Sequence, residues 1–287
     1  MNTSSRITYF IIGGSRGIGF NLVKILSAST GNTVITSIRG SPSLPKNKQV
    51  EDLAKIRKNI HIVQLDLTKD ESIGNIADEI KKTPFFLGID IFIACSAVSD
   101  SYYKVLETPK SVWLNHYSTN ALGPILALQK VYPLLLLKKT RKIFFISSVA
   151  GSINAFVPLS VSAYGQSKAA LNYAVKTLSF ELKPEGFTVV AFHPGMVSTD
   201  MGKYGIDHFK EKNIDISGVN IITPEESASA LIDVFRKILP EDNGKFFNYD
   251  GSEGVFKISA NLATYIQLRY GIYLCVIHFF IGRCYMM

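Results

Sequence analysis

The stretch KIFFISSVAGSINAFVPLSVSAYGQSK, residues 142 to 168, is the part of the sequence from which the rest can be interpreted. The segment KIFFI predicts a buried strand, which is followed by a loop with a pair of serines and by the start of a helix. Ser148 lies at the carboxyl end of that strand. Tyr164 and Lys168 are four residues apart, so on a helix their side chains project from one face, one turn apart.

This spacing indicates a proton-transfer pair. A phenol has a pKa near ~10, but a cation within ~4 to 6 Å favours its ionised form. Lys168 could act in this way on Tyr164, and Ser148 would add a hydroxyl beside them. Tyr-x-x-x-Lys alone is common on helix surfaces, so the interpretation depends on the serine pair and on a glycine cluster near the N-terminus.

The glycine cluster predicts a phosphate-binding turn. Residues 8 to 12 are a short apolar run that ends in GGSRGIG, and residues 20 to 26 continue with helical spacing. A strand, a glycine turn and a helix start direct backbone N–H groups and the positive end of the helix toward a phosphate. The alternative is a tight turn without a ligand, because such turns also need glycine.

Charge near this cluster predicts which dinucleotide binds. Residues 33 to 38 read as the second strand, and Arg39 follows where an NAD site usually has an acid. Arg39 and Arg16 could flank a 2'-phosphate, with no carboxylate opposing them. The alternative is two solvated surface arginines.

Most of the net charge of +8 lies in the first 60 residues, around the glycine cluster. Residues 1 to 60 contain nine Lys and Arg against two acids, whereas the remainder contains 22 against 21. This excess suits a phosphorylated cofactor. The sequence contains no basic stripe interleaved with aromatic residues, so nucleic-acid binding is not expected.

Together these motifs resemble the short-chain dehydrogenase/reductase family, whose signature is a Ser, then Tyr-x-x-x-Lys, with an Asn upstream. The resemblance covers residues 7 to about 254 and is nearest to the carbonyl-reductase branch that includes the C-factor and sniffer proteins. It implies a catalytic set of Asn120, Ser148, Tyr164 and Lys168, in which Asn120 holds a water linking the lysine to solvent. The alternative for Asn120 is an amide that satisfies backbone groups at an irregular helix turn.

The resemblance also implies a cofactor site for NADP(H). Asp66 and Leu67 would hold the adenine, and Val197 with Thr199 in HPGMVSTDM would hold the nicotinamide carboxamide. Thr68 and Glu71 offer another reason for polar residues near Asp66, because they predict a capping box for the next helix. The implied cofactor residues are Gly13, Ser15, Arg16, Gly17, Ile18, Gly19, Arg39, Asp66, Leu67, Ser96, Tyr164, Lys168, Val197 and Thr199.

The sequence departs from the family pattern at two places. Ile12 stands where the family usually has Thr, and Ala94, Cys95, Ser96 and Ala97 replace Asn-Asn-Ala-Gly. A thiol cannot supply the paired donor and acceptor of an amide, so the second departure bears on cofactor affinity. We interpret Cys95 as a small buried hydrophobic residue.

Strands that alternate with helices predict a single α/β domain over residues 1 to 256. Its fold class is a Rossmann-type doubly wound parallel sheet of about seven strands, with helices on both faces and the site at the carboxyl ends of the strands. The chain has 287 residues, of which 47% are hydrophobic, enough for one large core. Three scattered cysteines and the lack of an apolar leader favour a reducing, cytoplasmic location.

The predicted function is the NADPH-dependent reduction of an aldehyde or ketone, with Tyr164 as the proton donor. The alternative is a catalytically weak NADP(H)-binding regulatory protein. A small carbonyl compound is the expected partner, homo-oligomers are possible, and nucleic acid is not expected. No metal site is predicted, since His193 has no second ligand spaced for it and is interpreted as a packing residue at a strand end.

An apolar extension, residues 257 to 287, follows the predicted domain. Thirteen uncharged residues separate Arg269 from Arg283, short of the ~20 that a helix needs to cross a bilayer, so a membrane-attached enzyme is not favoured. Two interpretations stay open: a helix that docks on the protein or on a partner, and a tail extraneous to the fold. The second is favoured, because the closing motif of the family is lost where the apolar segment begins.

Overall fold

The computed structural model describes residues 6–84, 86–156 and 161–254, which form an α/β fold. Its main strands are β1 (Ile7–Ile12), β2 (Asn32–Ile38), β3 (Ile60–Gln64), β4 (Ile91–Ala94), β5 (Lys142–Ile146), β6 (Thr188–His193) and β9 (Phe246–Asn248). Two short strands are β7 (Met196–Val197) and β8 (Ile221–Ile222). The α-helices are α1 (Gly17–Leu26), α2 (Lys48–Ile56), α3 (Asp70–Lys81), α4 (Lys110–Tyr117), α5 (Gly123–Leu136), α6 (Ser162–Glu181), α7 (Asp200–Glu211) and α8 (Pro224–Lys237).

The central sheet has seven parallel strands in the order β3-β2-β1-β4-β5-β6-β9. The strand order reverses beside β1, because the chain moves outward to β2 and β3 and then crosses back to β4. Ligands of open parallel sheets bind outside the carboxyl ends of the strands at such a point. The predicted doubly wound sheet is therefore confirmed, and its topology places a crevice after β1 and β4.

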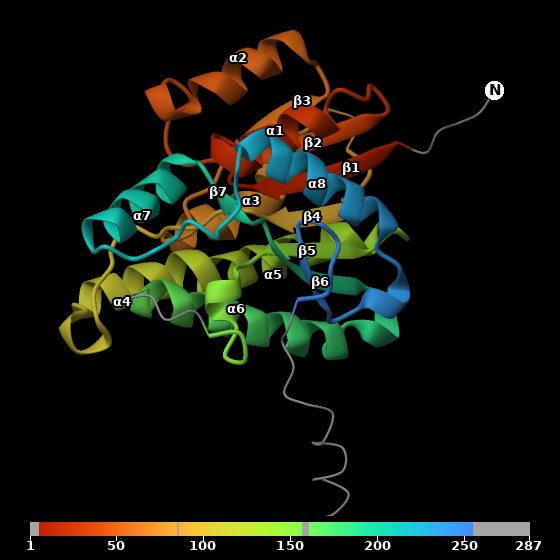
Figure 1. Ribbon diagram of the computed structural model, residues 1–287. Helices are drawn as coiled ribbons and strands as arrows, with labels where there is room; N and C mark the ends of the chain where they lie inside the picture. The colour runs from red at the N-terminus through yellow and green to blue at the C-terminus, as the bar shows by residue number, and fades with distance from the viewer. Residues whose placement is uncertain (1–5, 85, 157–160, 255–287) are drawn as a thin grey trace, which may run out of the picture.

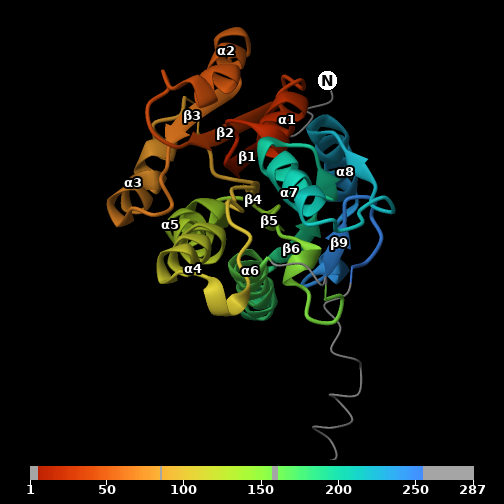
Figure 2. The ribbon, with the colours of Figure 1, turned by 60° about the vertical axis from the view of Figure 1, so that its left-hand side comes forward.

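Helices cover both faces of the sheet, with α1 and α8 on one side and α3 and α5 on the other (Figures 1 and 2). Alternate residues of β1 divide between the two cores: Phe10 and Ile12 pack with the apolar residues of α3, α5 and α6, whereas Tyr9 and Ile11 pack with those of α1, α2 and α8. Strands buried on both faces explain why the predicted strands are continuous apolar runs rather than alternating ones.

The irregular helix turn considered for Asn120 is a π-helical turn, Ser118–Leu122, between α4 and α5. Such turns insert a residue into a helix and rotate the side chains that follow. Here the turn contains Asn120, which is completely buried. The irregular turn thus directs this amide into the protein.

The capping box predicted for Thr68 and Glu71 is wrong, whereas the structure has one at the start of α8. Thr68 and Glu71 make no capping box, because the hydroxyl and backbone N–H of Thr68 both donate to Asp66 Oδ1, at 2.7 and 3.0 Å. Asp66 competes successfully for the threonine because it is only two residues away. At the start of α8, Thr223 and Glu226 do form the reciprocal pair.

In residues 6–84, 86–156 and 161–254, no helix combines the length and hydropathy needed to span a membrane. Both interpretations of the apolar extension concern residues outside those ranges. The boundary near residue 256 and the status of the extension stay predictions.

Candidate active site

A cavity of about 410 Å³ opens at the carboxyl edge of the sheet. Its walls follow β1, β4, β5 and β6, the strands on either side of the reversal in strand order. All predicted cofactor residues except Val197 line it, whereas Asn120 and Ser148 do not. The structure therefore brings together residues that are up to 186 positions apart, from Gly13 to Thr199.

The glycine turn is closed by contacts that leave no room for a side chain. Gly13 has a φ of +90°, and its N–H donates to Ser37 Oγ at 3.1 Å. A Cβ on Gly19 would lie 2.1 Å from the carbonyl oxygen of Gly13, so the first turn of α1 packs directly on the strand end. Residues 15–19 line the cavity, so the N-terminus of α1 lies at its wall. The N–H groups of a helix N-terminus are suited to bind the phosphates of a dinucleotide.

Tyr164 and Lys168 lie one turn apart on α6, as their spacing predicts. Lys168 is 1% exposed, and its Nζ donates to the carbonyl oxygen of Ile146 at the end of β5, at 2.9 Å. The same Nζ lies 5.9 Å from the centre of the Tyr164 ring. Because Ser148 also follows β5, one strand end and one helix position the three predicted catalytic residues.

Burial away from water is the largest cause of the pKa shifts of Tyr164 and Lys168. Burial raises the pKa of Tyr164 to about 12, although a hydrogen bond with Ser148 acts to lower it. Burial lowers the pKa of Lys168 to about 8. The net shift of the tyrosine is opposite to the one expected from a nearby cation, because removing the phenolate from water costs more than these contacts return.

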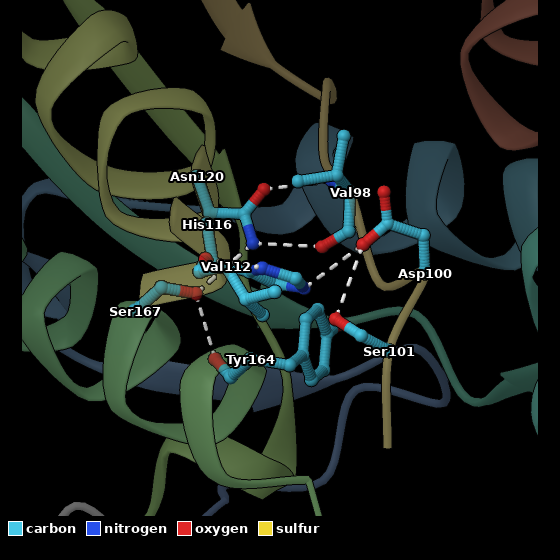
Figure 3. Close-up of polar contacts among 8 residues, drawn as sticks. All are labelled: Val98, Asp100, Ser101, Val112, His116, Asn120, Tyr164 and Ser167. Atoms are coloured by element: carbon cyan, nitrogen blue, oxygen red, sulfur yellow. Dashed lines mark hydrogen bonds and ion pairs between the residues drawn. The ribbon is translucent and has the colours of Figure 1, made fainter. Parts of the chain in front are cut away.

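The amide of Asn120 links three segments (Figure 3). Its Oδ1 accepts from the backbone N–H of Val98 at 2.7 Å, and its Nδ2 donates to the carbonyl oxygen of Val98 at 2.9 Å and to Ser167 Oγ at 3.0 Å. Ser167 Oγ in turn donates to the carbonyl oxygen of Tyr164 at 2.7 Å. Asn120 thus satisfies backbone groups, as the alternative interpretation expected, although in a neighbouring loop rather than in its own helix; the water-holding role stays a prediction.

The end of the cavity near β2 is basic. Arg39 lines it, and so do Lys46 and Gln49, which sequence reasoning missed. Their signal was the polar segment after β2, which lies on the same side of the sheet as Arg39. Burial acts to raise the pKa of Asp66, but hydrogen bonds from Thr68 and the charge of Arg39 lower it overall.

Arg16 has a partner that the sequence did not reveal. Its Nη1 lies 3.3 Å from Asp200 Oδ2, and both side chains are mostly exposed. The expectation that no carboxylate opposes the two arginines is therefore wrong. Asp200 begins α7, far along the chain, and only the fold brings it to the glycine turn.

The predicted nicotinamide residues lie at the start of α7. Thr199 lines the cavity and caps the helix, its Oγ1 accepting from the N–H of Gly202 at 3.1 Å. The side chain of Val197 is buried, and its backbone pairs with Ile222 in the β7–β8 ladder. The predicted contact of Val197 uses its backbone, so burial of the side chain is compatible with it.

The departure from the family pattern after β4 leaves a hydroxyl without a partner. Cys95 lines the cavity, and burial raises the pKa of its thiol to about 12, which makes it a poor nucleophile. Ser96 also lines the cavity, and its Oγ is buried without a hydrogen bond to the described part of the protein. A ligand with a polar edge would satisfy it.

His193 at the end of β6 is mostly buried, and burial lowers the pKa of its ring to about 4. Within the ranges that the structure describes, no group of three or more His, Cys, Asp or Glu side chains could hold a metal ion.

Comparison with known proteins identifies the class. The sequence model of the short chain dehydrogenase family matches residues 8–208, and this chain belongs to that family of oxidoreductases, which use NAD(P)(H). An uncharacterized oxidoreductase of Saccharomyces cerevisiae is 99% identical over 256 residues, which are 89% of this chain and 100% of that protein.

Solved structures place the chain close to carbonyl reductases. An NADPH-bound carbonyl reductase from chicken fatty liver has a TM-score of 0.78 and 25% identity, covering 87% of this chain and 94% of that one. The carbonyl reductase Sniffer of Drosophila melanogaster has a TM-score of 0.75 and 28% identity, covering 86% and 98%. The predicted family is confirmed, while the roles of individual site residues stay predictions.

The glycine turn can be tested with a matched pair of helix glycines. Gly19→Ala should lower the free energy of unfolding by about 1–3 kcal/mol or more, because its Cβ meets the Gly13 carbonyl. Gly74→Ala on α3 meets nothing within 4 Å and should raise it by up to ~1 kcal/mol through helix propensity. Urea unfolding of both variants measures the difference; equal stabilities would contradict the close contact.

Proposed function

We propose that the protein reduces an aldehyde or ketone with NADPH. The observation that carries this proposal is the position of Tyr164, whose phenol lies beside Ser148 and above the buried Lys168 at the inner end of the cavity. Three further cations, Arg16, Arg39 and Lys46, line the same cavity. The NADPH-bound chicken reductase has a similar fold, which supports the choice of dinucleotide.

The residues that line the cavity suit NADPH from one end to the other. The glycine turn would hold the pyrophosphate, Asp66 and Leu67 the adenine, and Lys168 the nicotinamide ribose. Val197 and Thr199 would hold the carboxamide, and Arg16 and Arg39, with Lys46, would contact the 2'-phosphate. When bound, the cofactor supplies a hydride to the carbonyl carbon.

Side chains of this chain supply the proton. Ser148 would donate a hydrogen bond to the carbonyl oxygen and orient it, and Tyr164 would transfer its proton to the same oxygen. The raised pKa of Tyr164 keeps the donor protonated at neutral pH. The ammonium of Lys168, 5.9 Å from the ring, would stabilise the phenolate that remains.

A second candidate is a cofactor-binding regulatory protein with little turnover. The observation that favours it is the Ala94, Cys95, Ser96 and Ala97 segment, where the amides of the family pattern are replaced and the hydroxyl of Ser96 has no hydrogen-bond partner among the described residues. NADPH oxidation measured against a panel of aldehydes, ketones and diketones separates the two. Binding of NADPH without oxidation by any member of the panel would favour the regulatory function.

Cofactor preference tests the basic end of the cavity. NADPH should bind at least ~10-fold more tightly than NADH, because a charge-assisted hydrogen bond contributes ~1.5–3 kcal/mol. Arg39→Asp should reduce or invert the preference. Asp200→Asn should increase it, because Arg16 loses the carboxylate with which it pairs.

Fluorescence titration of both dinucleotides measures these affinities. Lys58→Asp makes the same charge change as Arg39→Asp at an exposed position outside the cavity, and it should leave the preference unchanged. Equal affinities of the unmodified protein for NADPH and NADH would contradict the assignment.

The proton donor is tested by Tyr164→Phe, which removes the hydroxyl and keeps the ring. We expect kcat to fall by ~10²-fold or more while the Kd for NADPH changes little. Tyr173→Phe is the control, since Tyr173 lies on the same helix and is 77% exposed. Steady-state rates and cofactor titrations measure both quantities; unchanged turnover of Tyr164→Phe would rule out its role.

The pH dependence of kcat/KM tests Lys168. Its lowered pKa means that the ammonium is present below pH about 8 and is lost as the pH rises through that value. Without the cation the phenolate of Tyr164 is less stable, so kcat/KM for reduction should fall above pH about 8, approaching tenfold per pH unit. Lys168→Met should lack this decrease, and a constant kcat/KM up to pH 10 in the parent would contradict the role.

A further inference from the structure

The loop after β4 is held in place from the side of α4 and the π-helical turn (Figure 3). Asn120 binds both backbone groups of Val98, and Asp100 Oδ1 lies 3.6 Å from Nε2 of the completely buried His116. The other ring nitrogen, His116 Nδ1, is 2.9 Å from the carbonyl oxygen of Val112. These contacts fix the backbone just before Tyr102.

Tyr102 reaches from this loop to α7 and packs among its aromatic side chains. Its ring stacks on His208, with centroids 4.7 Å apart and an interplanar angle of 18°. It lies edge-on to Phe209 at 5.5 Å and tilted against Tyr204 at 5.5 Å. Tyr102 thus connects two segments that are separated by about a hundred residues in the sequence.

The helix makes room for this tyrosine. A Cβ on Gly205 would lie 2.5 Å from the Tyr102 hydroxyl oxygen, and Gly205 is in the middle of α7. Glycine inside a helix costs about 1 kcal/mol relative to alanine, so its presence here needs a reason. Space for the Tyr102 hydroxyl is that reason.

Tyr102 also lies near the catalytic tyrosine. The carbonyl oxygen of the next residue, Tyr103, accepts from Ser162 Oγ at 3.0 Å, two residues before Tyr164 on α6, and the Tyr102 phenol acts to raise the pKa of Tyr164. The cavity that holds the cofactor residues is lined by Tyr164 but by neither Ser148 nor Tyr102.

We propose that Tyr102 is a substrate-positioning residue, which forms with Tyr204 and His208 an aromatic wall of the carbonyl site. This wall selects aldehydes and ketones that carry an aromatic ring next to the carbonyl group. The assignment rests on the proposed reductase function. Tyr204 is 50% exposed, so aromatic surface on α7 is available to a second ring, and aromatic pairs contribute ~0.5–1.5 kcal/mol beyond the burial of their area.

Two aldehydes of similar size separate aromatic selection from general catalysis. Benzaldehyde and cyclohexanecarbaldehyde each present a six-membered ring beside the carbonyl. Tyr102→Leu should lower kcat/KM for benzaldehyde about three- to tenfold relative to cyclohexanecarbaldehyde, mainly through KM. Tyr102→Phe keeps the ring and should keep the ratio, and Tyr103→Leu, at the exposed neighbouring position, should not change it.

A double-mutant cycle tests the placement of Tyr102 without any substrate. Gly205→Ala should lower the Tm, because its Cβ meets the Tyr102 hydroxyl. Adding Tyr102→Phe removes that hydroxyl and should restore much of the loss. Additive effects would overturn the contact between Tyr102 and α7.

The outcomes distinguish this inference from the function on which it rests. If the parent reduces both aldehydes and Tyr102→Leu leaves their kcat/KM ratio unchanged, the aromatic wall is wrong while the reductase function stands. If the parent reduces neither aldehyde and no other carbonyl compound of a panel, the proposed function fails and this assignment fails with it.

Discussion

The candidate site depends on the hydrogen bonds of one buried amide. Asn120 is completely buried in a π-helical turn and binds the backbone of Val98 on one side and the hydroxyl of Ser167 on the other. The first contact fixes the loop that leads from β4 to Tyr102, and the second reaches α6, because Ser167 donates to the carbonyl oxygen of Tyr164. A buried amide with unpaired groups would cost about 1–3 kcal/mol for each, so the loop and the helix are held in register by that penalty.

Burial explains why this site differs from a simple tyrosine and lysine pair. Desolvation raises the pKa of Tyr164 and lowers that of Lys168, so both changes favour the uncharged forms. The same environment raises the pKa of Cys95, and Lys168 acts in the opposite direction on that thiol. Lys168 and Cys95 thus act on each other's ionisation, while burial has the largest effect on Tyr164 one helical turn away. Binding a polar ligand in the adjoining cavity would change this balance.

Local patterns predict most of the fold and the centre of the site. The apolar runs before Gly13, Cys95 and Ser147 are strands, and the four-residue spacing of Tyr164 and Lys168 does place them on one face of α6. What could not be predicted depends on segments far apart in the sequence. Asp200 reaches Arg16 only because α7 begins beside the glycine turn, and Lys46 lines the cavity because its loop folds back toward β2. Thr68 shows the limit of a local rule, since its hydroxyl and backbone N–H both donate to Asp66 instead of taking part in a capping box.

Helix α7 touches both ends of the site, and the two contacts differ in strength. Asp200 at its start forms an exposed ion pair with Arg16, and such pairs contribute about 0–1 kcal/mol because water and salt screen them. His208 and Phe209 near its other end pack on Tyr102, where ring contacts and burial do not depend on salt. A phosphate in the cavity could replace Asp200 as the partner of Arg16, because an exposed ion pair costs little free energy to break. The aromatic contacts therefore hold α7 more firmly than its ion pair with Arg16 does.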